Sequence, residues 1–425
     1  MLKQVEGSHA MAEAIALCRP EVICAYPITP QTHIVEGLGE LVRKGELANC
    51  EFINVESEFA ALSVAIGASA AGARAYTATA SQGLLYMAEA VYNASGLGLP
   101  IVMTIGNRAI GAPINIWNDH SDAMSMRDAG WMQLFAETNQ EAADLHIQAF
   151  KLAEELSMPV MVCVDGFILT HAVERIDVPD QATVDAYLPP YDPIQVLDPA
   201  LPVSIGAMVG PEAFTEVRFL AHYKQTKALR LIPELAKEFS VKFGRESGGL
   251  LRCYRAEDAD MLVVAMGSVC GTIKDTIDEM REEGIRIGLV TVVSYRPFPT
   301  DALRNVLAGA RDVVVVEKSI SVGVGGPLAN NVDMSLRNLP RAPRLHSAVA
   351  GLGGRPITRS SLDRMFRQAA VQPWEGTHFL DLNERVVGRE IHRTGKTRHS
   401  GPTAENILRQ IAQSARFAGD AREKL

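Results

Sequence analysis

The chain has 425 residues, of which 47% are hydrophobic and 21% are charged, as is ordinary for a globular protein, and this length predicts two or three domains. Its net charge of −9, without a long basic run, argues against nucleic acid and anionic membrane surfaces as partners. Residues 1–20 lack the apolar core of a signal peptide, and no stretch approaches the ~20 apolar residues of a membrane helix, so we expect no membrane span and a cytoplasmic location.

Residues 22–170 alternate short apolar runs with helical patterns. The apolar runs cover residues 22–26, 51–55, 74–80, 100–106 and 159–166. They are continuously apolar, as is typical of strands buried on both faces of a parallel sheet. Helical patterns lie between them, notably over residues 56–72 and 82–95. This alternation predicts a doubly wound parallel-sheet α/β domain.

The middle of the chain changes character. A series of prolines between residues 176 and 211 predicts an extended connector, and a long polar-amphipathic helix follows over residues 212–243. A second α/β unit is then expected, with strands over residues 260–268, 285–293 and 312–319 and helices over residues 271–284 and 300–310. From about residue 375 the chain is more polar, and residues 400–415 have the pattern of an amphipathic helix. We therefore divide the chain into residues 1–245, 246–375 and 376–425.

Polar side chains follow four of the predicted strands of the first unit. They are Thr29 after the first strand, Glu56 and Glu58 after the second, Ser81 and Gln82 after the third, and Asn107 and Arg108 after the fourth. In an α/β sheet, ligands bind outside the carboxyl ends of the strands, so we expect these side chains to converge on one crevice. The planar fork of Arg108 suits a carboxylate or a phosphate, because it can donate two parallel hydrogen bonds.

Each of these residues also has a plain structural interpretation. Thr29 and Ser81 could be helix N-caps, and Glu56 and Glu58 could be acids that complement the dipole of a helix in its first turn. Arg108 could pair with an acid on the surface. Each signal is weak alone, but their common placement favours a functional site.

No complete cofactor signature is present, since the sequence has neither GxGxxG after the first strand nor a Walker motif. The glycine-rich residues 321–331 could hold an anion with their backbone amides, although a tight structural turn is the more common use of such a cluster. The six cysteines form no CxxC pair, which argues against an iron–sulfur cluster or structural zinc held by this chain.

Several longer stretches resemble one protein family. They are AYPITPQT, VESEFAA, TASQGLLYM, NRAIGAPINIWNDHSDAMSMRDAGW and MGSVCGTIKDTIDEM. Together they are similar to the alpha subunit of 2-oxoacid:ferredoxin oxidoreductases, especially the pyruvate:ferredoxin oxidoreductase type, and the resemblance covers about residues 5–375. It implies that residues 1–245 are a thiamine diphosphate pyrimidine-binding domain with the connector and long helix attached. Residues 246–375 would be a transketolase C-terminal-like α/β domain, and residues 376–425 a polar C-terminal extension.

The resemblance also implies which cofactors and partners to expect. In the family, thiamine diphosphate is shared between this subunit and a beta subunit, whose GDG…N motif holds the diphosphate and Mg²⁺. This chain has no GDG, so it would supply half of the site and no metal ligand. The 4Fe-4S clusters would lie in partner subunits, including gamma and delta-type subunits, and ferredoxin would be the usual electron acceptor.

Residue roles come from the same resemblance. Thr29 would face thiamine and the 2-oxoacid, held in place by Pro27 and Pro30, because proline restricts both its own φ and the residue before it. Glu58 matches the family's thiamine-activating glutamate at N1′ of the aminopyrimidine, and Arg108 matches the arginine that binds the substrate carboxylate. Thr29, Glu58, Ser81 and Gln82 are thus the expected cofactor-binding residues, and Thr29, Glu58 and Arg108 the expected catalytic ones.

The implied reaction converts a 2-oxoacid and CoA to acyl-CoA and CO₂ and passes electrons to an acceptor. Pyruvate is the leading substrate, while an aryl or branched 2-oxoacid such as phenylglyoxylate or 2-oxoisovalerate stays open, because Thr29 and Arg108 would bind only the part common to all 2-oxoacids. A non-catalytic assembly subunit that kept the fold is an alternative of another class, and the presence of Thr29, Glu58 and Arg108 counts against it.

Overall fold

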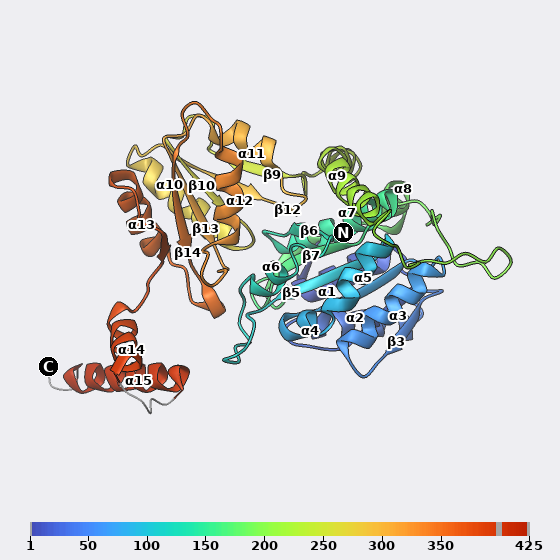
Figure 1. Cartoon of the computed structure of the whole chain (residues 1–425), viewed down its shortest axis with the longest axis horizontal. Helices are drawn as coiled ribbons and strands as arrows, with labels where there is room; N and C mark the ends of the chain where they lie inside the picture. The colour runs from blue at the N-terminus through green and yellow to red at the C-terminus, as the bar shows by residue number, and fades with distance from the viewer. Residues whose placement is uncertain (1, 397–401, 423–425) are drawn as a thin grey trace. The chain divides into compact units, whose positions relative to one another are not determined.

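The computed structural model describes residues 2–396 and 402–422, and the chain divides after His378 into two compact units. The first unit holds two mainly parallel β-sheets with their covering helices, and the second is helical (Figure 1). Within the described residues, no helix is both long and apolar enough to span a bilayer.

The first sheet has seven strands in the order β12-β6-β7-β5-β4-β2-β3. In chain order these are β2 (Val22–Ala25), β3 (Glu51–Asn54), β4 (Ala75–Thr79), β5 (Val102–Asn107), β6 (Met132–Phe135), β7 (Val160–Asp165) and β12 (Ser294–Arg296). All pairings are parallel except that of β12 with β6. The five predicted strands of this unit are therefore confirmed, while β6 and β12 were not predicted.

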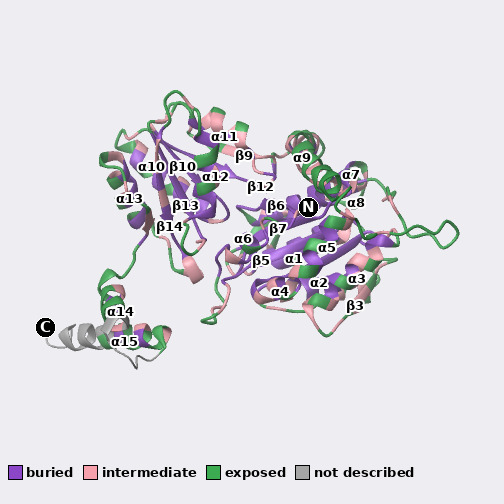
Figure 2. Cartoon of the chain, in the orientation of Figure 1, coloured by how far each residue is buried: buried purple, intermediate pink, exposed green. Residues whose placement is uncertain are grey.

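The side chains of successive residues in each central strand pack into different hydrophobic cores on the two faces of the sheet. In β7, Val160, Val162 and Val164 join one hydrophobic core, while Met161 and Cys163 join the other. This explains why the strands are apolar throughout rather than alternating. One face is covered by α1 (Gly7–Leu17), α2 (Thr32–Arg43), α7 (Asn139–Leu156) and α9 (Phe214–Phe243), and the other by α3 (Glu58–Ala70), α4 (Ser81–Tyr86) and α5 (Ala88–Leu97). Figure 2 shows the strands buried beneath these helices.

Three predicted segments, two helices and the connector, differ from the observed structure. The helix expected over residues 56–72 begins at Glu58, because Ser57 is its N-cap and accepts a hydrogen bond from the backbone N–H of Ala60. The helix expected over residues 82–95 is two helices, α4 and α5, which meet at Met87. The connector is not extended throughout, since it contains β8 (Val173–Asp177), paired with β1 (Leu2–Glu6), and α8 (Gln181–Tyr187). The long helix is confirmed as α9.

The second sheet has six strands in the order β15-β14-β13-β10-β11-β9. They are β9 (Leu251–Tyr254), β10 (Met261–Ala265), β11 (Ile287–Val292), β13 (Asp312–Glu317), β14 (Arg344–Val349) and β15 (Thr377–Phe379). The three predicted strands are confirmed as its central strands β10, β11 and β13, which run parallel. Around it lie α10 (Val269–Glu282), α11 (Thr300–Leu307), α12 (Pro327–Leu336) and α13 (Arg359–Val371), with the short 3₁₀ helix η1 (Leu352–Gly354).

The two sheets share one hydrophobic core. The cluster on the α3–α5 face of the first sheet continues into Val264, Val290 and Val315 of the second. Phe135 at the end of β6 packs edge-on against Tyr295 of β12, with ring centroids 6.2 Å apart. Strand β12 lies beyond residue 245 in sequence but pairs with the first sheet, so the predicted division near residue 245 is crossed by a strand.

The second unit contains α14 (Glu384–Lys396) and α15 (Thr403–Arg422). The side-chain amide of Asn406 donates a hydrogen bond of 3.1 Å to Glu390 and so joins the two helices. The amphipathic helix predicted over residues 400–415 is confirmed from Thr403 onward, and its first residues lie outside the described ones or before the helix.

Candidate active site

The predicted site residues lie at the carboxyl ends of β2, β3, β4 and β5, along one edge of the first sheet. Thr29 follows β2 and is exposed, and it is not a helix cap, because α2 begins at Thr32 with Gln31 as its N-cap. Ser81 is buried as the first residue of α4 and is not a cap either. Its Oγ lies 2.5 Å from both Gln82 Oε1 and the carbonyl oxygen of Ala109, and its single O–H donates to one of these two acceptors.

The side chain of Arg108 forms hydrogen bonds with the segments that follow β2, β4 and β5. Its guanidinium donates from Nη1 to the carbonyl of Thr29 at 2.8 Å, from Nε to the carbonyl of Asn115 at 3.3 Å, and from Nη2 to Gln82 Oε1 at 3.4 Å. The residue is 7% exposed, and burial lowers its pKa. Within the described part of the chain, no carboxylate forms an ion pair with this guanidinium, so the interpretation of Arg108 as half of a surface pair is wrong.

The hydrogen-bond count at Arg108 leaves room for a ligand. A guanidinium has five N–H groups, and three are used. The remaining two are one on Nη1 and one on Nη2. A buried guanidinium with an unused N–H group on each terminal nitrogen can bind a carboxylate.

Asp122 fixes the backbone around this guanidinium. Its carboxylate is fully buried in α6 (Ser121–Ser125) and accepts hydrogen bonds from the backbone N–H groups of Ser81 at 3.0 Å and Arg108 at 2.9 Å, and from Asn107 Nδ2 at 2.8 Å. Burial raises the pKa of Asp122 to about 6, against these hydrogen bonds. Asp122 thus joins the ends of β4 and β5. Asp122 was not predicted as a site residue, although it lies inside one of the family-like stretches.

Glu58 lies beside the start of α4. It is half-buried in the first turn of α3, and a Cβ atom added to Gly83 would fall 2.8 Å from Glu58 Oε1 and 2.5 Å from Thr79 Oγ1. Glycine at position 83 therefore permits this close approach. Thr79 Oγ1 is buried without a hydrogen-bond partner, and the described residues offer no donor to the Glu58 carboxylate. The half-buried carboxylate of Glu58 is therefore available to bind a polar group.

Glu56 does not share this position. It is exposed and precedes the N-cap Ser57, so it lies outside α3. The dipole interpretation therefore fits only Glu58, and the expectation that both glutamates are helical was wrong. Of the two carboxylates, only Glu58 contacts the end of β4 and the start of α4.

Backbone N–H groups of the glycine-rich residues 321–331 already bind a carboxylate of this chain. The carboxylate of Glu317, at the end of β13, accepts hydrogen bonds from the N–H groups of Leu328 at 2.8 Å and Ala329 at 3.0 Å, at the N-terminus of α12. A Cβ on Gly326 would overlap Glu317 Oε1, so a side chain at this position would displace the carboxylate. The structural-turn interpretation therefore holds, and burial raises the pKa of Glu317 to about 7.

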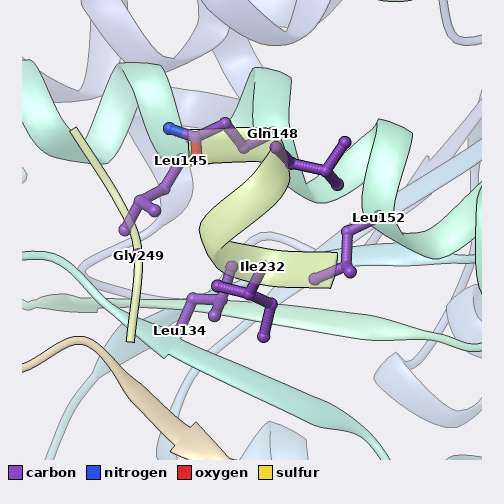
Figure 3. A pocket seen from close by; sticks show the side chains of 7 residues that line it. Leu134, Leu145, Gln148, Leu152, Ile232 and Gly249 are labelled. Carbon is purple, nitrogen blue, oxygen red and sulfur yellow. The ribbon is translucent and has the colours of Figure 1, made fainter. Parts of the chain in front are cut away.

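A small cavity elsewhere in the core is not a competing site. It lies between α7, α9 and β6 and is lined mostly by aliphatic side chains, among them Leu134, Leu152 and Ile232 (Figure 3). Its volume of about 10 Å³ is close to the space of one water molecule.

Comparison with known proteins places most of the chain in one family. Residues 13–237 match the family described as pyruvate flavodoxin/ferredoxin oxidoreductase, thiamine diphosphate-binding. Residues 259–362 match the pyruvate:ferredoxin oxidoreductase core domain II. The first range contains every strand of the first sheet except β12, and the second contains β10, β11, β13 and β14 of the second sheet.

Curated relatives are similar over nearly their whole length. Pyruvate synthase subunit PorA of Methanosarcina barkeri is 46% identical over 390 residues, which is 90% of this chain and 97% of that protein. Ketoisovalerate oxidoreductase subunit VorA of Pyrococcus horikoshii is 39% identical over 357 residues, which is 84% of this chain and 90% of that protein.

Two solved structures share the fold. The 2-oxoglutarate:ferredoxin oxidoreductase of Magnetococcus marinus superposes with a TM-score of 0.67 at 18% identity, over 87% of this chain and 65% of that one. A split-gene transketolase, described as an inactive beta4 tetramer, superposes with a TM-score of 0.51 at 13% identity, over 86% and 98%. These likenesses confirm the predicted fold class of two parallel-sheet α/β domains.

Proposed function

Because the chain belongs to the pyruvate flavodoxin/ferredoxin oxidoreductase family, we propose that it is the alpha subunit of a CoA-acylating pyruvate oxidoreductase. The reaction is pyruvate + CoA + oxidised acceptor → acetyl-CoA + CO₂ + reduced acceptor. The observation that supports it most directly is the buried Arg108 guanidinium, which has two unused N–H groups, one on each terminal nitrogen, and no carboxylate partner among the described residues.

The chain's own residues divide the work at the site. Arg108 would bind and orient the 2-oxoacid carboxylate through its two free N–H groups. Thr29, exposed at the end of β2, would add a small hydroxyl donor on the same edge. Fixing the substrate in this way lowers the entropy cost of reaching the reactive geometry.

Thiamine diphosphate, when bound, supplies the electron sink for decarboxylation. Glu58 would hold and move a proton at N1′ of its aminopyrimidine. Ser81 and Gln82 would border this pocket, with Gln82 linked to Arg108. The partly exposed carboxylate of Glu58, to which no described residue donates a hydrogen bond, supports the fit of a polar ring at this edge.

Further subunits would complete the enzyme. We propose a beta subunit that holds the diphosphate and Mg²⁺, and gamma and delta-type subunits whose 4Fe-4S clusters pass electrons to ferredoxin, all in the cytoplasm. Support comes from the curated relatives, which are named as subunits, and from the absence of GDG in this sequence.

A branched 2-oxoacid is the second candidate substrate. It is favoured by the similarity to VorA, whose name states ketoisovalerate, but the identity to VorA is 39% against 46% to PorA. A non-catalytic assembly role is disfavoured by the free donors of Arg108 and the unpaired carboxylate of Glu58.

The deciding experiment is turnover of the complex formed by this chain with its partner subunits. CoA-dependent acceptor reduction is measured with pyruvate, 2-oxoisovalerate, phenylglyoxylate and 2-oxoglutarate. We expect the highest kcat/KM with pyruvate. A higher kcat/KM with 2-oxoisovalerate would make that 2-oxoacid the substrate in place of pyruvate. If a complex that contains thiamine diphosphate turned over none of the 2-oxoacids, the proposed function would be overturned.

A further inference from the structure

Resting on the proposed function, we propose that the second α/β unit positions Arg108 for the substrate carboxylate. It does so by contacting residues 115–122, here called the anchor segment, through the loops that follow the carboxyl ends of its own strands. The positioning residues are Lys318, which follows β13, and Gly353, in η1.

Three hydrogen bonds tie the anchor segment to the second sheet. Asn115 Nδ2 donates to the carbonyl of Gly353 at 3.2 Å, and the N–H of Gly353 donates to Asp119 Oδ2 at 3.0 Å. The backbone N–H of His120 donates to the carbonyl of Lys318 at 2.8 Å. A Cβ on Gly353 would lie 2.5 Å from Asn115 Nδ2, and Gly353 has a φ of +58°, so both the contact and the backbone favour glycine.

A buried ion cluster reinforces this attachment. Asp165, at the end of β7, accepts a hydrogen bond from Lys318 Nζ at 2.8 Å through Oδ2, and its Oδ1 is 2.7 Å from His120 Nε2. All three side chains are at most 5% exposed. Ser268, after β10, donates its backbone N–H to the same carboxylate at 2.9 Å. The ends of β7, β10 and β13 therefore meet at one carboxylate, beside the start of α6.

The anchor segment in turn holds Arg108 at both ends. At its first residue, the carbonyl of Asn115 accepts the hydrogen bond from Arg108 Nε. At its last residue, the carboxylate of Asp122 accepts the backbone N–H of Arg108. A shift of this segment would therefore move both the backbone and the fork of Arg108, and a bidentate contact loses strength steeply when its geometry changes.

A second ion cluster joins the same two sheets without touching the anchor segment. Glu137, just after β6, accepts hydrogen bonds from Arg252 in β9 and from Lys274 in α10. Because this cluster serves attachment alone, Lys274 provides a matched control for Lys318: each is a lysine of the second sheet's unit paired with a carboxylate of the first.

The test compares Lys318→Met and Gly353→Ala with Lys274→Met in the assembled complex. We expect Lys318→Met and Gly353→Ala to raise KM for pyruvate by about tenfold or more, with kcat within about threefold and thiamine diphosphate content unchanged, since only binding of the carboxylate is weakened. Lys274→Met should change KM by less than about twofold. An equal rise in Lys274→Met, or a wild-type KM in Gly353→Ala, would overturn the inference.

Removal of the Lys318 ammonium leaves the buried carboxylate of Asp165 with one cationic partner fewer, which lowers the free energy of unfolding. The double variant Lys318→Met/Asp165→Asn removes that charge, and the inference requires its KM to stay raised; a return to the wild-type KM would refute it. If neither Lys318 variant assembles, Gly353→Ala decides. A wild-type complex without 2-oxoacid turnover would contradict the proposed function, whereas an active wild type with unaltered variants would contradict this inference alone.

Discussion

Replacing Arg108 with lysine keeps the positive charge and removes the fork. The guanidinium donates three hydrogen bonds to the protein and has two free N–H groups, whereas a lysine ammonium has three donors on one atom. Lysine can therefore neither reach Thr29, Asn115 and Gln82 together nor present two parallel donors to a carboxylate. We expect Arg108→Lys to bind the 2-oxoacid much more weakly while thiamine diphosphate content stays at the wild-type level.

The expected size of the effect comes from the contact that is lost. A hydrogen bond to a charged group is worth roughly 1.5–3 kcal/mol, and each 1.4 kcal/mol is a factor of ten, so KM should rise about 10- to 150-fold. The assay is steady-state acceptor reduction against pyruvate concentration, with cofactor content and melting temperature measured on the same preparations.

Arg74→Lys is the matched control. Arg74 is buried to 4% exposure, but its guanidinium makes a two-point contact with the carboxylate of Glu154. Its replacement should lower the melting temperature and leave KM unchanged. If Arg108→Lys behaves like Arg74→Lys, with a lower melting temperature and an unchanged KM, then Arg108 is structural and the bidentate interpretation is refuted.

Three further predictions concern other residues and the whole chain. Glu58→Gln should slow H/D exchange at thiamine C2 in the complex by ~10²–10⁴, since glutamine cannot exchange a proton, while Glu56→Gln should change it little; the reverse result would move the role to Glu56. The chain without its partners should bind thiamine diphosphate weakly and show no decarboxylation, and full turnover by the isolated chain would contradict a half-site. Glu317 has a pKa raised from 4.5 to about 7, so its contribution to the free energy of unfolding should be lost as pH rises through about 7, by on the order of 3 kcal/mol. Urea unfolding at pH 5 and pH 8 should therefore show Glu317→Gln gaining stability relative to wild type at the higher pH, and a constant difference would count against the burial argument.

The sequence predicted strands well where burial is complete on both faces. Val160, Val162 and Val164 on one face of β7 alternate with Met161 and Cys163 on the other, and both sets are apolar. Strand β14 was missed because it carries polar residues. His346 is fully buried there, and both Arg344 and His346 contact the carboxylate of Asp312 on the neighbouring strand. A hydropathy pattern reports only on neighbouring residues, so it does not reveal an ion pair between strands that are far apart in the sequence.

The same limit applies to the site. Chain order along a parallel sheet was enough to place Thr29, Ser81, Gln82 and Arg108 at one edge, because the carboxyl end of each strand determines where the next few residues lie. The role of Asp122 depends on donors from two separate strands, 41 and 14 residues away in the chain. The pairing of Lys318 with Asp165 spans 153 residues. Such contacts become evident only when the second sheet is placed against the first.

The pairing of β12 with β6 has a consequence for how this protein can be dissected. Strand β6 would be the outermost strand of the first sheet if the chain stopped near residue 245, and its N–H and C=O groups on that side would have no partner strand. Residues 294–296 supply that partner from within the second α/β domain. An open strand edge invites pairing with another molecule, so β12 also protects the first sheet against self-association. A piece of this chain in which β6 is paired on both sides must therefore extend at least to residue 296.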